Sequence, residues 1–460
     1  MTFPPQPLSP LDGRYRETVG ALGEFLSEAG LNRARVYVEV EWLICQTQQR
    51  LFGTTPLSDT AQQQLRSLVT DFGPTDIAEL ASLEATTRHD VKAVEYYLRR
   101  RIELHGLGHI AELIHFACTS EDINNLAYAL TVRDALHTVW LPRFDAVITR
   151  LTDLAHKYAD AAMLSHTHGQ PATPSTMGKE LAVHAYRLTR VRAQIAGSEF
   201  LGKFSGATGT YSAHVVAAPE VAWLDISRGF VESLGLQWNG LTTQIESHDW
   251  QAELYSRIAH ANRILHNLAT DIWTYISIGY FRQIPIVGAT GSSTMPHKIN
   301  PIRFENAEAN LELSCAVLDS LAATLVTSRL QRDLSDSSAQ RNIGLGFGHS
   351  LLALDNLCRG LNEIDLDRSA LSADLDTNWE VLSEAIQTVI RAEVVAGRST
   401  ISDPYTLLKN LTRGQRLGAP ELATFVSGLE IGDAAKQRLL ALTPAAYTGL
   451  AAELAATLER

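Results

Sequence analysis

The sequence predicts an all-α fold of three helical domains, of which the central one is a bundle of long helices. Apolar residues recur at three- and four-residue spacing along most of the 460 residues, which is the period of one helix face. No alternation of strand and helix patterns interrupts that period. Glycine-containing or polar segments divide the chain into a mixed N-terminal domain at residues 1–108, the long-helix bundle at 109–362 and a C-terminal domain of shorter helices at 363–460.

Two long helices follow directly from the apolar spacing. One face runs from Phe144 to Tyr158, and a second runs from Leu254 to Tyr275 within a segment that lacks glycine and proline. Asp249 stands just before the second pattern and is the expected N-cap. Long helices need long neighbours, so these two predict an extended bundle with one flank buried against another subunit.

A third and longer helix is expected at residues 302–343, which contain neither glycine nor proline. Arg332, Asp333 and Asp336 lie within this segment and exclude a membrane span. The segment therefore predicts another helix of the bundle.

Composition narrows the class of protein. With 45% hydrophobic and 20% charged residues, the chain can bury a large core. The N-terminus has no basic region followed by an apolar run, and no stretch of about 18 apolar residues occurs, so we expect neither a signal peptide nor a membrane partner. The formal net charge of -12 disfavours nucleic acid as a partner.

Cysteine usage and nucleotide-binding motifs exclude further classes. The four cysteines form no CxxC pair, which disfavours a zinc site and fits the reducing cytoplasm. No GxGxxG follows a strand, and no GxxxxGK[ST] loop occurs, so neither a dinucleotide-binding domain nor a P-loop is supported. Short extended pieces are expected at residues 203–211 and 238–245.

Four segments concentrate polar residues before apolar helical patterns. They are TTRHDVKA at 86–93, CTSEDINN at 118–125, SHTHGQPATPST at 165–176 and GATGSSTMPHKINP at 288–301. Helix-start amides and the positive end of the helix dipole favour an anion at such places. Helix capping by Thr119, Ser120 or Thr176 would explain the polar residues of any one segment. It does not explain why the four segments together also contain histidines, a lysine and an asparagine.

Each candidate also has a structural interpretation. His89 is equally compatible with a structural imidazole at a helix start, whereas the glycine and proline around His168 place it in a loop, where function is common. Ser292 and Ser293 are compatible with a flexible linker, although the prolines that follow make the segment rigid. Those prolines hold Lys298 in place directly before a long helix.

The string GSSTMPHKINP resembles the signature G-S-S-x-M-P-x-K-x-N-P of the fumarase/aspartase superfamily, whose members are nearly all-helical homotetramers. His297 within it, together with SPLDGRY, TTRHDVKAVEYYL and THGQPATPST, resembles the enterobacterial-type branch of the adenylosuccinate lyase family. The resemblance extends from Ser9 to about Tyr447. It implies cleavage of a small phosphorylated succinyl substrate with release of fumarate, at sites built from three subunits of a homotetramer.

The resemblance also implies roles for individual residues. Ser292 removes the Cβ proton of the succinyl group, and His168 protonates the departing nitrogen. The succinyl carboxylates are bound by Lys298, Asn300, Thr119 and Ser120. The other implied substrate-binding residues are Arg14, Tyr15, Arg88, His89, Asp90, Gln244, Ile299, Asn306, Arg332, Ser337, Ser338, Ala339, Gln340 and Arg341, with His89 and Lys298 also counted as catalytic. Arg88 and His166 depart from the enterobacterial pattern, where asparagine and arginine are common, which leaves the substrate contacts at these two positions open.

The implied chemistry fits these residue types. Removing a proton beside a carboxylate gathers charge on that carboxylate, which fixed cations such as Lys298 stabilise. Ser292 acts as a base only where a positive, water-excluding site lowers its pKa. The elimination needs no metal or redox cofactor, and the sequence offers no metal-ligand cluster. Two alternatives stay open: another fumarate-releasing lyase of the superfamily, and a non-catalytic helical scaffold, which would not need Ser292 and His168.

Overall fold

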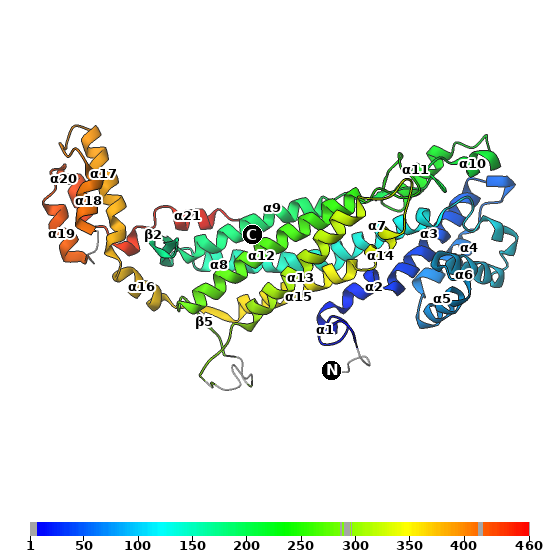
Figure 1. The fold of residues 1–460 in the computed structure, drawn as a ribbon, viewed down its shortest axis with the longest axis horizontal. Coiled ribbons are helices and arrows are strands. Elements are labelled where there is room, and N and C mark those ends of the chain that lie inside the picture. Colours follow the sequence, from blue (N-terminus) through cyan, green and yellow to red (C-terminus); the bar gives the residue numbers. More distant parts are fainter. Residues whose placement is uncertain (1–6, 286–287, 289–294, 296, 413–416, 460) are drawn as a thin grey trace. The chain divides into compact units, whose positions relative to one another are not determined.

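The computed structural model describes residues 7–285, 288, 295, 297–412 and 417–459. Helices make up most of these residues, and the few strands are short, so the all-α prediction is confirmed (Figure 1). The chain forms two compact units. The first contains Met1–Phe144, Val191–Arg263 and Ala309–Asp355, and the second contains Asp145–Arg190, Ile264–Glu308 and Asn356–Arg460. The division into three domains at residues 108 and 362 stays a prediction.

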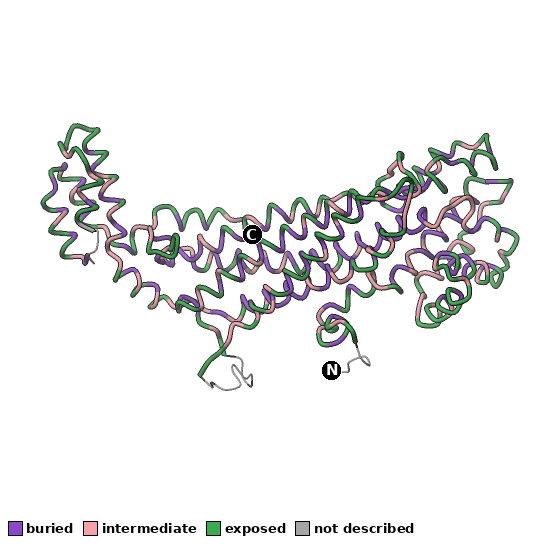
Figure 2. The backbone as a smooth tube through the Cα atoms, viewed as in Figure 1, coloured by how far each residue is buried: buried purple, intermediate pink, exposed green. Residues whose placement is uncertain are grey.

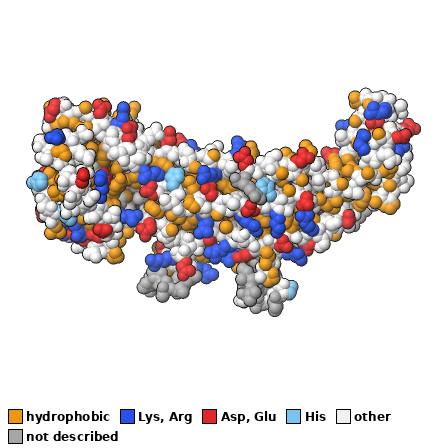
Figure 3. All heavy atoms as spheres, turned by 180° about the vertical axis from the view of Figure 1, so that it is seen from behind, with side chains coloured by type: hydrophobic (Ala, Val, Ile, Leu, Met, Phe, Trp, Pro, Cys, Tyr) orange, Lys and Arg blue, Asp and Glu red, His pale blue; other side chains and the backbone are white. Residues whose placement is uncertain are grey.

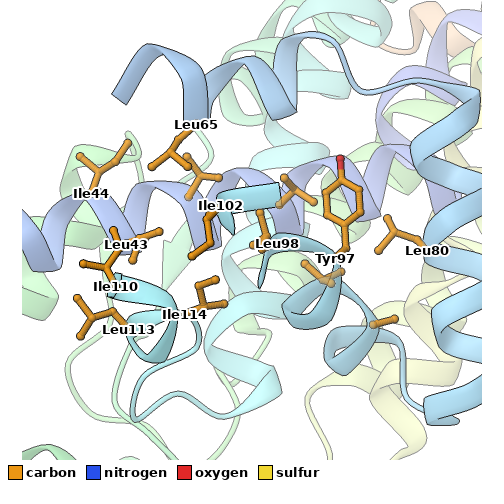
Figure 4. Packing of buried hydrophobic residues seen from close by; sticks show 14 of the residues in the cluster. Leu43, Ile44, Leu65, Leu80, Tyr97, Leu98, Ile102, Ile110, Leu113 and Ile114 are labelled. Atoms are coloured by element: carbon orange, nitrogen blue, oxygen red, sulfur yellow. The ribbon is translucent and has the colours of Figure 1, made fainter. Parts of the chain in front are cut away.

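The first unit carries most of the shorter helices of the N-terminal half. Its α-helices are α1 (Arg16–Val19), α2 (Gly23–Leu26), α3 (Glu28–Gln48), α4 (Asp59–Thr70), α5 (Pro74–Thr87), α6 (Asp90–Leu104), α7 (Ser120–Ala135), α10 (Ser212–Ala217), α11 (Trp223–Ser233) and α14 (Ser335–Gln340). A buried apolar cluster joins α3 to α6 and includes Leu43, Leu65, Tyr97 and Ile102 (Figure 4). Burial of each such side chain stabilises the fold by about 1.5–3 kcal/mol.

Five long helices contribute residues to both units. They are α8 (Leu141–Lys157), α9 (Met177–Ala196), α12 (Asp249–Ser277), α13 (Ile302–Leu325) and α15 (Ile343–Asn362). Buried positions recur along them (Figure 2). On α12 the predicted face from Leu254 to Tyr275 is buried as far as Ile272, and Tyr275 is half-buried, so the helical period indicated the packing surface correctly over most of its length.

A buried polar layer lies between long helices of the first unit. Asn262 on α12 donates to the Ser314 hydroxyl on α13 at 2.9 Å and accepts from the Ser350 hydroxyl on α15 at 2.8 Å. The Trp140 indole N–H donates to Ser350 at 2.9 Å, and Ser314 donates to the Gly346 carbonyl. Because each of these buried groups has a partner, the layer fixes the register of the helices without leaving an unpaired polar group.

The remaining helices and all but one pair of strands belong to the second unit. The helices are α16 (Arg368–Asp376), α17 (Ser383–Val395), α18 (Pro404–Thr412), α19 (Ala419–Ser427), α20 (Asp433–Leu440) and α21 (Ala451–Ala456). Strands β1 (Ala162–Thr167) and β2 (Gln170–Thr176) form an antiparallel hairpin, and β5 (Phe281–Gln283) pairs with β6 (Ile364–Leu366). In the first unit, β3 (Leu201–Gly202) pairs in parallel with β4 (Gln237–Trp238). Among the described helices, none alone is long and apolar enough to cross a bilayer, and α20 with residues 444–456 reaches that composition only as a pair bent by 104°.

The structure corrects the prediction of one helix over residues 302–343. Helix α13 ends at Leu325, and α14 begins only at Ser335. Between them Leu330 has a left-handed backbone with φ 52°, and the Asp333 carboxylate accepts from the backbone N–H groups of Arg329 at 3.1 Å and Ser335 at 2.8 Å. Asp and Ser side chains compete for backbone groups in this way, and their bonds here replace the helical ones.

Three smaller corrections concern a helix start, the positions of two short strands and a hairpin. Helix α12 includes Asp249, so His248 rather than Asp249 occupies the N-cap position. The extended pieces lie earlier than expected, since β3 ends at Gly202 and β4 ends at Trp238. The β1–β2 hairpin around Gly169 was not predicted, because its polar sequence lacks the alternation that marks a strand.

Candidate active site

His168 lies at the tip of the β1–β2 hairpin. Thr167 pairs with Gln170, which leaves His168 and Gly169 as the two turn residues. Both have left-handed backbones, with φ 54° and 72°, as a two-residue hairpin turn requires. Glycine adopts this conformation without cost, whereas histidine occupies it less readily. The turn therefore presents an exposed imidazole, whose ring makes no hydrogen bond to any residue that the structure describes.

The base of this hairpin is firmly held. The Ser175 hydroxyl donates to Glu180 at 2.7 Å, and the Thr173 hydroxyl donates to Glu384 at 2.6 Å. At the start of α9, a Cβ on Gly178 would lie 2.4 Å from the Ala155 carbonyl oxygen of α8, so only glycine allows this close approach. These contacts fix the strands that carry His168.

The signature segment is described only in part. Ser292 and Ser293 lie outside the described residues, so the structure gives no account of the predicted base. Gly288 has a left-handed φ of 82°, a conformation typical of glycine. Lys298 is exposed, and its backbone N–H donates to the Met295 carbonyl at 3.0 Å.

The residues that follow lead into α13. The Gln283 amide donates to the Ile299 carbonyl at 2.8 Å, and Asn300 is two residues before the helix starts. Asn306, on the first turns of α13, accepts from the Asn356 amide of α15 at 3.0 Å. Lys298 and Asn300 thus stand before the N-terminus of a 24-residue helix, a position that favours a bound anion.

In the first unit, His89 caps α6. Its Nδ1 accepts from the Lys92 backbone N–H at 3.2 Å, and the side chain is 52% exposed. Since Nδ1 acts as an acceptor, the proton of the neutral ring lies on Nε2, which is then a donor for a ligand. His89 is therefore a structural imidazole at a helix start, as one of the two interpretations has it, and its Nε2 is still available to bind a ligand. Arg88 beside it is exposed, with a left-handed φ of 57°.

Asp90 lies between two arginines. Its Oδ2 accepts from Arg35 at 2.8 Å and from Arg341 at 3.0 Å, and its Oδ1 accepts from the Val91 N–H at 2.8 Å. Burial alone would raise the pKa of Asp90, but the Arg35 charge, the Val91 N–H and the Arg341 charge hold it below the usual value. The Asp90 carboxylate is therefore ionised at neutral pH.

Arg341 follows α14 and also binds Glu28. The hydrogen bond to Glu28, with the nearby charge of Asp90, raises the pKa of Arg341 despite partial burial. A cavity of about 180 Å³ lies beside it, lined also by Tyr128 and Gln340. Because Arg341 is 38% exposed, its guanidinium can reach a ligand as well as its two carboxylates.

Arg332 forms a second cationic group. Its guanidinium lies 2.9 Å from Glu121 of α7 and 3.5 Å from the Gln244 amide oxygen. The buried Arg332 Nε has no hydrogen-bond partner among the described residues, a donor that a bound anion or water would satisfy. Thr119 and Ser120 immediately precede Glu121 in the sequence, so Arg332 lies beside the start of the helix that carries these two predicted residues.

The residues predicted on α14 differ in exposure. Ser338 is exposed and Ser337 is half-buried, as is Ala339. The Gln340 side chain is buried, and its amide lies 3.3 Å from His248 and 3.2 Å from Gln251. Gln340 therefore fastens α14 to α12 in addition to lining the cavity.

The two N-terminal candidates lie at the first helix of the chain. Tyr15 occupies the N-cap position of α1, and the Arg14 guanidinium lies 5.8 Å from the centre of its ring. This distance fits a cation–π contact. His166, which departs from the enterobacterial pattern, is exposed on β1 opposite Pro171.

Three charged residues near these groups were not predicted. They are Glu28, Arg35 and Glu121, which pair with Arg341, Asp90 and Arg332. In the sequence, each of these residues is only a charged residue at a helix position where the apolar spacing would predict an apolar one. That signal does not distinguish a buried charge from a solvated one.

Comparison with known proteins places the chain in a family. A family model described as Lyase matches residues 13–317, and a model described as Adenylosuccinate lyase C-terminal matches residues 328–448. With the long-helix fold, the first match defines the class as a lyase of the fumarase/aspartase superfamily. The chain belongs to the adenylosuccinate lyase family within that class.

Curated relatives agree over almost their whole length. The chain is 48% identical over 451 residues to the adenylosuccinate lyase of Escherichia coli K12, with 96% of each chain covered. It is 47% identical to that of Vibrio cholerae and 46% identical to that of Haemophilus influenzae, with 97% of each chain covered.

Solved structures with lower identity share the fold. A fumarate lyase from Mesorhizobium sp. BNC1 aligns with a TM-score of 0.75 at 19% identity, over 95% of this chain and 97% of that one. A 3-carboxy-cis,cis-muconate lactonizing enzyme from Pseudomonas putida aligns with a TM-score of 0.74 at 22% identity, over 95% and 96%. At these identities the likeness establishes the architecture alone.

Proposed function

We propose that the chain cleaves adenylosuccinate to AMP and fumarate, and cleaves succinylaminoimidazole carboxamide ribotide to its carboxamide product and fumarate, in purine nucleotide biosynthesis. The observation that carries this proposal is the 48% identity to an adenylosuccinate lyase over 96% of both chains. The C-terminal family match at residues 328–448 supports it, because this range contains Arg332 and Arg341.

Both substrates carry a phosphate, and the first unit offers cations for it. The Nε donor of Arg332 has no partner among the residues that the structure describes, and Arg341 is partly exposed beside a cavity. Ser337 and Ser338 lie on α14, between the two arginines in the sequence, and Ser338 is exposed. Guanidinium and hydroxyl groups in this arrangement suit a phosphate dianion.

The elimination requires a base, an acid and stabilisation of developing charge. Ser292 takes the Cβ proton, and the charge that then gathers on the adjacent carboxylate is stabilised by Lys298 and Asn300 before the N-terminus of α13. His168 donates a proton to the leaving nitrogen, a role that imidazole side chains commonly take in general acid catalysis. Thr119 and Ser120 bind the other succinyl carboxylate at the start of α7.

We also propose a cytoplasmic homotetramer in which each active site combines residues of three subunits. Large apolar side chains are exposed on the long helices, including Tyr186 at 61%, Trp273 at 41% and Leu313 at 52%. Hydrophobic side chains lie among charged ones on the face shown in Figure 3. Exposed apolar residues on long helices favour burial against another subunit. The His168 ring makes no hydrogen bond to a described residue, so it is available to complete the active site of a neighbouring subunit.

A substrate panel tests the activity. The purified chain is incubated with adenylosuccinate, the succinylated carboxamide ribotide and argininosuccinate, and fumarate and the second product are quantified. The proposal predicts equimolar fumarate and AMP from adenylosuccinate and no release from argininosuccinate. Release from argininosuccinate alone would favour the rival lyase, and no release from any substrate by a folded oligomer would favour the scaffold.

Complementation tests the shared site. Subunits carrying Ser292→Ala and subunits carrying His168→Ala are unfolded, mixed and refolded together. If the two residues come from different subunits, some sites of mixed oligomers regain both, and activity returns. Verified mixed oligomers that stay inactive would contradict the shared site.

A further inference from the structure

We infer that Arg35 is a positioning residue that keeps Arg332 and Arg341 ready for the substrate phosphate. Its side chain is 1% exposed, so it does not touch the substrate. It acts instead through two chains of hydrogen bonds, one to the half-buried Arg332 and one to the more exposed Arg341. The inference deepens the proposed function and rests on it for the phosphate-bearing substrate.

The first chain runs through Asp90. Arg35 Nη2 donates to Asp90 Oδ2 at 2.8 Å, and Arg341 Nη2 donates to the same oxygen at 3.0 Å. Because Arg35 is buried and bonded, its charge permanently balances that of Asp90. Asp90 therefore positions Arg341 without neutralising it, and the remaining counter-charge of Arg341 is Glu28, a 58% exposed carboxylate whose attraction water screens.

The second chain runs through Asn124 and Glu121. Arg35 Nε donates to Asn124 Oδ1 at 2.9 Å, and the Asn124 amide donates to Glu121 Oε1 at 2.8 Å. The same Glu121 oxygen lies 2.9 Å from Arg332 Nη2. The position of Arg332 thus depends on the Glu121 carboxylate, which is bonded to Asn124, and Asn124 is in turn held by Arg35.

A third hydrogen bond uses the remaining nitrogen of the Arg35 guanidinium. Arg35 Nη1 donates to Asn32 Oδ1 at 2.9 Å, one turn earlier on α3. Three directed donors from one planar group require arginine, since a lysine ammonium cannot reach all three acceptors at once. Arg35→Lys should therefore retain the charge that balances Asp90 but lose the geometry, whereas Arg35→Met loses both.

Phosphate binding separates this role from a general loss of structure. Inorganic phosphate and, separately, fumarate are titrated into the full-length wild type, Arg35→Lys, Arg35→Met and Arg35→Met/Asp90→Asn by calorimetry. The matched control is Arg101→Met, which removes a part-buried arginine paired with Asp76 and Glu79 rather than with predicted site residues.

We expect Arg35→Met to weaken phosphate binding about tenfold, within the range of measured coupling between neighbouring residues, and to leave fumarate binding unchanged. Arg35→Lys should have a smaller effect. Asp90→Asn in the Arg35→Met background should recover part of the loss, because it removes the uncompensated carboxylate beside Arg341. The control should bind phosphate as the wild type does.

Three results would overturn the inference: unchanged phosphate affinity in folded Arg35 variants, an equal loss of phosphate and fumarate binding, or a wild type without a phosphate site. If Arg35→Met does not fold, Arg35→Lys decides by the same criteria. Adenylosuccinate turnover by the wild type is measured separately. A wild type that binds phosphate through Arg35 but does not turn over adenylosuccinate would refute the proposed function and leave the inference standing.

Discussion

Asp90 Oδ2 accepts hydrogen bonds from Arg35 at 2.8 Å and from Arg341 at 3.0 Å, so one carboxylate oxygen joins a buried arginine to an exposed one. Arg35 belongs to α3, Asp90 begins α6 and Arg341 follows α14. Residues more than 300 positions apart in the chain thus meet at one atom, beside the cavity to which Arg341 contributes. This meeting point links the fold of the first unit to the proposed phosphate site.

His168→Gln tests the proposed acid. The substitution should lower kcat by about a hundredfold to ten-thousandfold, the usual contribution of general acid–base catalysis, with a much smaller change in KM. Since the ring is exposed at a hairpin tip, Tm should not change. Steady-state kinetics and thermal unfolding of the same preparation measure both, and the exposed His109→Gln, outside the candidate site, serves as control. A variant with full kcat would contradict the assignment.

His115 should make the stability of the protein depend on pH. Burial alone would lower the pKa of His115, but its 2.6 Å hydrogen bond with Glu39 and the charge of Glu39 raise it above the ordinary value of 6.5. A raised folded-state pKa stabilises the protein fully below pH 6.5 and loses that contribution as pH rises through the folded value.

The free energy of unfolding of the wild type should therefore exceed that of His115→Gln most at about pH 6 and progressively less above it. Denaturant unfolding at several pH values measures this difference, with the exposed His109→Gln as control. A difference that grows with rising pH would show that the charged form of His115 is not the stabilised one.

Leu330→Gly should stabilise the link between α13 and α14. Leu330 is 91% exposed and has φ 52°, a conformation that costs a branched residue more than glycine. We expect a gain of about 0.5–1 kcal/mol in the free energy of unfolding by urea. Leu334→Gly is the matched control, because Leu334 is also exposed but has φ -91° and should lose stability when replaced. Destabilisation at Leu330 equal to that at Leu334 would refute the strain argument.

Ser350→Ala tests the buried polar layer of the bundle. It would leave the Trp140 indole N–H and the Asn262 amide oxygen without the partner that Ser350 provides. Loss of a buried partner costs about 1–3 kcal/mol, measured as the free energy of unfolding. Ser67→Ala, which removes only a solvent-exposed hydrogen bond to the Gln64 carbonyl, should change stability by much less. If both substitutions have the same small effect, the layer does not stabilise the bundle.

The sequence was sufficient for the helical architecture, because long helices are specified by local periodicity. The apolar face of α12 predicted from Leu254 to Tyr275 is buried as far as Ile272 and half-buried at Tyr275. It was insufficient where side chains compete for backbone groups, as Asp333 does after α13, and where two polar strands form a hairpin around Gly169. Periodicity contains no information on either event.

The candidate site was predicted in part. The signature, the THG turn and the N-caps at Thr119 and His89 all contain local patterns that indicate chemistry or helix starts. Arg35 and Glu121 contain none, because their importance arises only when distant helices meet. Long-range charge pairing of this kind becomes visible in the structure alone.

The central claim is most directly tested by following the ultraviolet change as adenylosuccinate is converted to AMP by the wild type, beside a Ser292→Ala variant. We expect turnover by the wild type and loss of nearly all of it in the variant, with the oligomer intact in both. No turnover by an intact wild-type oligomer would contradict the proposed activity, and full turnover by Ser292→Ala would contradict the proposed base.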